Sequence, residues 1–127
     1  ETSLQLRTVL KRFLPKAKEH KILAQMFQAI RIEVNEELEV LKDFLHQVPK
    51  LLNDNGRLSV ISYHSLEDRL VKRFIRTGMF EGEPEKDVFG HSNEPLKKVG
   101  KLIVPTQDEI KSNNRARSAK LRVATLK

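Results

Sequence analysis

Two polar residues, Ser62 and His64, stand where an apolar run gives way to an amphipathic segment. Residues 57–63 read as a strand, and the spacing of apolar residues over 65–77 predicts a helix. In open α/β sheets, ligands bind beyond the carboxyl ends of strands, and the free N–H groups of a helix N-terminus favour an anion. Ser62 and His64 are therefore candidate residues of a pocket.

A purely structural interpretation of the same turn stays open. Ser65 resembles a helix N-cap with Asp68 as the acid of the first turn, and His64 would then be hydrogen-bonded to backbone. A hydrolase built on His64 is a distant third possibility. No Gly-x-Ser-x-Gly elbow is present, and adjacent Ser and His residues seldom form a working nucleophile pair.

A second group consists of Arg115, Arg117 and Ser118, at the entrance to a predicted last strand over 118–126. Arginines two residues apart can bind phosphate oxygens with two hydrogen bonds each. The alternative is a basic loop that contacts only water. If the last strand runs antiparallel to the strand ending at Tyr63, its start meets that strand's end. Arg115, Arg117 and Ser118 would then converge on His64.

A third group, Gln28, Arg31 and Asn35, shares a polar strip beside the apolar stripe of a long predicted helix. A partly buried Arg31 and Asn35 pair could orient a base or a phosphate. The alternative is an ordinary boundary of an amphipathic helix, with a surface contact between Arg31 and Glu36 that contributes little.

The elements that would position these groups follow from periodicity and turn residues. Apolar side chains from Leu23 to Leu45 recur at spacings of 4, 3, 4, 4, 3 and 4, which predicts one helix continuing to Leu52. The continuous apolar run in 57–63 predicts a parallel sheet covered on both faces. The remaining expectations are a helix over 2–14, a polar connector over 16–21, a loop over 79–96 with Phe80, Val88 and Phe89 as anchors, a strand over 99–104 and a short helix over 107–111.

The positive charge of the chain is concentrated near its end. The formal net charge is +7, and residues 97–127 carry nine Lys and Arg against only Asp108 and Glu109, whereas residues 1–96 are neutral overall. Such a patch attracts polyanions, of which nucleic acid is the commonest. Apolar residues are interleaved with these charges, so we expect a folded basic face rather than a solubilising tail.

Composition excludes several other classes of protein. There is no cysteine, so neither a disulfide framework nor a cysteine zinc site is possible, and the four histidines show no metal-ligand spacing. No Gly-rich phosphate loop and no apolar run of membrane-spanning length is present. Six Phe, one Tyr and no Trp offer no obvious platform for stacking bases. We expect a single-domain-sized chain of the cytoplasm, with no metal site and no membrane partner.

Three long strings carry a resemblance to a known family: QAIRIEVNEELEVL (28–41), GRLSVISYHSLEDRLVKRF (56–74) and NNRARSAKLRVA (113–124). In this order they resemble the C-terminal part of the ribosomal RNA small subunit methyltransferase H (MraW) family. The resemblance is close over 23–126 and loose over the first twenty residues. The family's His-Pro-Ala lead-in reads Lys21-Ile22-Leu23-Ala24 here, so no role of that lead-in is carried over.

The resemblance implies an α/β fold, namely the C-terminal portion of a class I (Rossmann-like) methyltransferase. It implies about three strands, the last one antiparallel, with flanking helices. Residues 1–21 would be the end of an inserted helical domain, and 22–127 the C-terminal part of the methyltransferase domain. The family's Gly-rich loop and ribose-binding acid belong to the N-terminal half, so no cofactor-binding residue is expected in this chain.

The resemblance also implies a function: transfer of a methyl group from S-adenosylmethionine to N4 of a cytosine in 16S rRNA of the small ribosomal subunit. Ser62 and His64 would then lie at the pocket rim near the base. The expected substrate- and RNA-binding residues are Arg31, Asn35, Arg115, Arg117 and Ser118. Alone, the chain is expected to be inactive and to form a homodimer, or to aggregate, through an exposed sheet edge. The alternative is a non-catalytic basic RNA-binding or interaction module.

Overall fold

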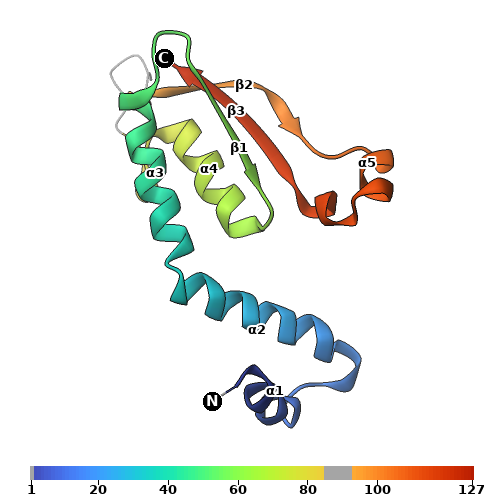
Figure 1. The fold of residues 1–127 in the computed structure, drawn as a ribbon. Coiled ribbons are helices and arrows are strands. Elements are labelled where there is room, and N and C mark those ends of the chain that lie inside the picture. Colours follow the sequence, from blue (N-terminus) through green and yellow to red (C-terminus); the bar gives the residue numbers. More distant parts are fainter. Residues whose placement is uncertain (1, 85–92) are drawn as a thin grey trace. The chain divides into compact units, whose positions relative to one another are not determined.

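The computed structural model describes residues 2–84 and 93–127. The chain divides into two compact units, Glu1–Glu37 and Leu38–Lys127, each of which is described by itself (Figure 1). The predicted anchors Val88 and Phe89 lie outside the described residues.

The first unit is helical. Helix α1 (Ser3–Lys11) begins with a capping box, in which the Thr2 hydroxyl accepts from the Gln5 N–H (3.4 Å) and the Gln5 side chain accepts from the Thr2 N–H (2.8 Å). A 3₁₀ turn, η1 (Lys16–Lys18), leads into α2 (Glu19–Val34). The predicted first helix is thus confirmed with a shorter end, and α2 starts inside the stretch predicted as a connector.

The single helix predicted from 23 to 52 is wrong, because α2 ends at Val34 and α3 (Glu37–Leu51) starts a new helix. Glu36 has φ of 51°, in the left-handed region that interrupts an α-helix. The apolar period continues across this break, since Val34 and Leu38 are four residues apart. Periodicity alone therefore could not reveal the interruption.

The second unit contains α3 and a three-stranded sheet of β1 (Arg57–Ser62), β2 (Leu96–Ile103) and β3 (Lys120–Leu126). The strand order is β1-β3-β2, with β3 antiparallel to both neighbours. The predicted antiparallel last strand is confirmed. Helix α4 (Ser65–Thr77) follows β1, and α5 (Gln107–Ser112) and the 3₁₀ turn η2 (Asn114–Ser118) link β2 to β3 (Figure 1).

The parallel sheet predicted from the apolar run of 57–63 is wrong for the described residues. Strand β1 is paired only with the antiparallel β3, and its burial alternates, with Leu58 and Ser62 buried and Ile61 exposed. The strand boundaries also shift. Strand β2 begins three residues before the predicted Val99, and β3 begins two residues late because η2 occupies the approach to it.

The core of the second unit lies between one face of the sheet and the helices α3 and α4. Its buried members are Leu45, Val48, Leu58, Val71, Phe74, Ile75, Leu96 and Ala124. Phe80, a predicted anchor, stacks on Phe74 with ring centroids 5.1 Å apart, and His46 meets both rings edge-on. Gly78 follows the last residue of α4 as its C-cap and has φ of 69°, a left-handed conformation that ends a helix.

The opposite face of the sheet is apolar and open among the described residues. Ile61 of β1 and Ile103 of β2 are 57% and 54% exposed, and both are opposite Leu121 of β3 in the strand register. Only α3 and α4 among the described helices join the buried core cluster, which places both on the other face.

Candidate nucleic-acid interface

The turn between β1 and α4 is closed by a capping box centred on His64. The His64 Nδ1 accepts from the Glu67 N–H (3.4 Å), and the Glu67 carboxylate accepts from the N–H groups of Tyr63 (3.1 Å) and His64 (3.4 Å). The predicted cap, Ser65 with Asp68, is therefore one residue out of place. A histidine was not an expected N-cap, since short oxygen-bearing side chains lead that preference. The prediction that His64 is hydrogen-bonded to backbone is confirmed.

The other ring nitrogen of His64, Nε2, lies 3.2 Å from a Glu67 carboxylate oxygen and has no hydrogen-bond partner within the described part of the chain. Glu67 and Asp68 both lie in the first turn of α4 and already complement its free N–H groups. The N-terminus of α4 is consequently a poor place for an anionic ligand.

Ser62, the last residue of β1, is only 3% exposed. Its hydroxyl has no hydrogen-bond partner within the described part of the chain. In the strand register Ser62 is opposite Lys120, the first residue of β3. The end of β1 and the start of β3 therefore meet, as the antiparallel arrangement requires.

Asp68 of α4 links this helix to the start of β3. Arg122 of β3 donates from Nε to one Asp68 carboxylate oxygen (2.7 Å) and from Nη2 to the other (3.1 Å), and Lys120 adds a third contact at 3.3 Å. Asp68 is 8% exposed, so the two cations stabilise a nearly buried carboxylate. The sequence predicts Asp68 only as an acid in the first turn of the helix over 65–77. One pattern in the sequence could have revealed this cluster. Lys120 and Arg122 are two residues apart on a predicted strand, so both lie on the same face of it.

The hydrogen bonds from Arg122 lower the pKa of the Asp68 carboxyl below its ordinary value, and the charges of Arg122 and Lys120 act in the same direction. Desolvation opposes them and is outweighed. Asp68 is therefore ionised throughout the neutral range, which keeps the corner between α4 and β3 closed.

The residues of the second predicted group lie on η2, just before this corner. Arg115, Arg117 and Ser118 are exposed, while Ala116 between them is buried and anchors the turn. The Asn113 side chain accepts from the Arg115 N–H (3.2 Å) and starts the turn. Within residues 2–84 and 93–127 neither arginine is ion-paired, and no hydrogen bond joins this group to His64.

Arg31 and Asn35 lie in the first unit, at the end of α2. Arg31 contacts both carboxylate oxygens of Glu37 (2.8 and 3.1 Å), and the Asn35 side-chain amide donates to the same carboxylate (3.2 Å). The expected partner Glu36 is wrong, because its left-handed backbone ends the helix there. Both residues are exposed rather than partly buried. Their contacts stabilise the break between α2 and α3.

The described residues do not fit S-adenosylmethionine. The turn after β1 contains no glycine that would let backbone approach a ligand closely, and its capping contacts fill it. The buried acid nearby, Asp68, already accepts three hydrogen bonds and so is not available to ribose hydroxyls. We therefore derive no step through that group. Among the described residues no helix is both long and apolar enough to cross a membrane.

The last strand, β3, lies between β1 and β2 and is antiparallel to both, and helices pack on one face of this sheet. This arrangement places the chain in the class of Rossmann-like α/β proteins. The sequence model of the MraW methylase family matches residues 1–127, and the chain belongs to this family.

Known relatives agree with this assignment. The chain is 67% identical over 124 residues to ribosomal RNA small subunit methyltransferase H of Christiangramia forsetii, covering 98% of this chain and 41% of that protein. The protein of the same name from Flavobacterium psychrophilum is 66% identical over 122 residues, covering 96% and 42%. That of Bacteroides fragilis is 48% identical over 128 residues, covering all of this chain and 42% of the relative. The chain thus spans about two fifths of the length of these relatives.

The ion pair at Asp68 gives a pH-dependent prediction for the intact protein. Because folding lowers the pKa of Asp68, its stabilising contribution is complete above a pH of about 4 and is lost as the pH falls through the folded-state pKa. We expect Asp68→Asn to lower the free energy of unfolding at pH 7 by about 2 kcal/mol. The difference from the parent protein should shrink steadily as the pH falls below about 4 in urea titrations.

The matched control is Asp108→Asn. Asp108 contacts Lys111 at 3.1 Å, but its side chain is 91% exposed, so water screens the ion pair. We therefore expect almost no change in the free energy of unfolding at pH 7 or at pH 3. An Asp68→Asn difference that stays constant from pH 7 to pH 3 would contradict the assignment.

Proposed function

We propose that the protein is an S-adenosylmethionine-dependent methyltransferase that modifies N4 of a cytosine in 16S rRNA. In this proposal the present chain supplies part of the rim of the catalytic pocket and an RNA-facing surface. Membership of the MraW methylase family and the names of the relatives support an rRNA substrate. The observation that carries the assignment to this chain is the meeting of the β1 end with the basic start of β3, where Ser62 is opposite Lys120.

The roles follow from exposure and contacts. Arg115 and Arg117 are exposed on η2 with Ser118 beside them, and they bind phosphate oxygens of the RNA. His64 and the buried Ser62 are positioning residues that hold the shape of the rim near the base. Arg31 and Asn35 act through Glu37, and they hold the end of α2 for substrate binding.

The chemistry asked of these residues is orientation. Attack by an exocyclic amine on a methyl group depends on aligning the reacting atoms, and holding reactants in place contributes several kcal/mol to a lower barrier, about 7–11 kcal/mol at best. The contacts of this chain fix an RNA strand and a turn rather than supply a strong base. We assign cofactor binding to parts of the intact cytoplasmic protein other than the residues described here.

A second candidate function is a non-catalytic RNA-binding or interaction module. The concentration of positive charge in residues 97–127 favours it, because that charge binds polyanions whether or not chemistry follows. The two candidates differ in one observable. Only the methyltransferase links loss of RNA contact at η2 to loss of methyl transfer.

The double substitution Arg115→Ala with Arg117→Ala in the intact protein tests this link. We expect the KM for small ribosomal subunits to rise about tenfold, since each lost phosphate contact weakens binding without touching the reacting atoms. We expect kcat to change much less. Methyl incorporation at the target cytosine is the measurement, with Arg7→Ala and Arg12→Ala, two exposed arginines of α1 and the residue after it, as the control pair. Unchanged kinetics of the η2 variant would overturn the assignment of Arg115 and Arg117.

The isolated chain of residues 1–127 gives a separate prediction. Strand β1 is at the edge of the sheet, and its exposed Ile61 belongs to the open apolar face. Exposed edges of this kind favour association, so we propose that the isolated chain forms a homodimer and has no methyltransferase activity. Light scattering and a methylation assay are the measurements. A monodisperse monomer would contradict the first expectation, and methylated ribosomal subunits the second.

A further inference from the structure

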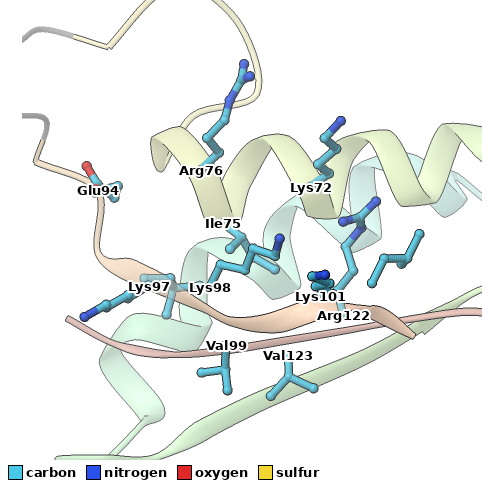
Figure 2. A pocket seen from close by; sticks show the side chains of 12 residues that line it. Lys72, Ile75, Arg76, Glu94, Lys97, Lys98, Val99, Lys101, Arg122 and Val123 are labelled. Atoms are coloured by element: carbon cyan, nitrogen blue, oxygen red, sulfur yellow. The ribbon is translucent and has the colours of Figure 1, made fainter. Parts of the chain in front are cut away.

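A groove with basic walls runs between α4 and the strands β2 and β3, and Arg122, the partner of Asp68, is one of its lining residues. It encloses about 350 Å³. Lys72 and Arg76 project from α4, and Lys98 and Lys101 come from β2 (Figure 2). Buried Ile75 and Leu96 contribute apolar surface at its base. We call this feature the α4–β2 groove.

The local fold explains why these cations gather. Val71, Phe74 and Ile75 turn one side of α4 into the core, which leaves Lys72 and Arg76, one turn apart, on an exposed side. On β2 the strand register shifts between Val99, opposite Val123, and Ile103, opposite Leu121.

This shift is a bulge in which β2 uses four residue steps where β3 uses two. Gly100 has φ of 67°, a conformation that glycine adopts at low cost, and nothing lies within 4 Å of a Cβ built there. The bulge therefore depends on backbone freedom rather than on space. It places Lys101 and Leu102 beside the groove instead of in the regular alternation of the strand.

The groove carries positive charge that no described acid neutralises. Arg122, at its floor, is paired with Asp68, and Glu94, at its mouth, contacts Lys127 at 2.9 Å. By contrast, Lys72, Arg76, Lys98 and Lys101 have no ion pair with any residue of 2–84 or 93–127. Lys97 also lines the groove, and these cations together attract a ligand with several negative charges.

The type of anion follows from the lining. Among residues 2–84 and 93–127 no aromatic side chain lines the groove, so these residues offer no surface on which bases would stack. Lysines predominate, and they bind phosphates as point charges without reading sequence. Its position also matters, because β2 ends at Ile103 beside the first residues of β3, where η2 leads in. A strand of nucleic acid on η2 can therefore continue along β2.

We propose that the α4–β2 groove binds the phosphate backbone of RNA, as a second contact that extends the one at η2. This inference rests on the proposed function for the choice of RNA as the polyanion. It adds Lys72, Arg76, Lys98 and Lys101 to the residues that hold the substrate, at positions remote from the pocket rim. These contacts add affinity without sequence specificity.

The experiment uses the intact protein and a fluorescent single-stranded RNA of twenty uridines, without methyl transfer. The groove variant is Lys72→Gln, Arg76→Gln and Lys98→Gln. The control variant is Lys16→Gln, Lys50→Gln and Arg69→Gln, which removes the same charge from exposed side chains outside the groove. The dissociation constant is measured by anisotropy from about 50 to 200 mM salt, where phosphate contacts dominate the salt dependence.

We expect the groove variant to bind the RNA about tenfold or more weakly at low salt. The slope of log K against log salt should fall by about two, since each lost phosphate contact on a single strand removes about 0.7. The control variant should change affinity by no more than about twofold. Circular dichroism melting curves establish that both variants are folded.

Two results would overturn the proposal. One is parent-like RNA binding by the groove variant, and if that variant has also lost binding to polyglutamate, the groove is a site for an acidic protein segment. The other is an equal loss of RNA binding in both variants, which would mean that the effect depends only on net charge. This assay needs no methyl transfer, so it also works with an intact protein that has no methyltransferase activity. Such a protein would refute the proposed function, but RNA binding by the groove could still be tested.

Discussion

The Asp68 carboxylate is the constraint on which the arrangement of the second unit depends. It is nearly buried, and Arg122 and Lys120 of β3 bind it from the central strand of the sheet. A buried carboxylate without these partners would be strongly destabilising, so α4 and the start of β3 must stay together. This contact holds the start of β3, into which η2 leads, opposite the end of β1. It also holds Arg122 at the floor of the α4–β2 groove, where its charge is already neutralised.

Much of this arrangement was predictable from local sequence patterns. The apolar periods of α3 and α4, the stop at Gly78 and the extended segments of β1 and β3 are each encoded within a few residues of where they occur. The antiparallel last strand was only a supposition from the residues and was implied by the family resemblance, and the register of Ser62 with Lys120 confirms it. The roles of Ser62, His64, Arg115, Arg117 and Ser118 in binding stay predictions.

What could not be predicted depends on contacts between distant residues or on backbone conformation. The partners of Asp68 lie 52 and 54 positions away, and no local pattern pairs them. The break at Glu36 is a positive φ at a non-glycine residue, which no residue type announces. His64 replaces Ser65 as the cap because the ring nitrogen reaches the Glu67 N–H from one position earlier. The α4–β2 groove could not be predicted because its cations come from a helix and from a bulged strand. Nothing in the sequence of either element shows that the two lie side by side.

A double-mutant cycle on Asp68 and Arg122 tests the central claim most directly. The free energy of unfolding of the intact protein is measured at pH 7 for the parent, Asp68→Asn, Arg122→Met and the double variant. The account predicts a coupling energy above about 1 kcal/mol, because both single changes remove the same interaction between α4 and β3. Effects that add to within about 0.3–0.5 kcal/mol would mean that the two side chains act independently, and would contradict the account.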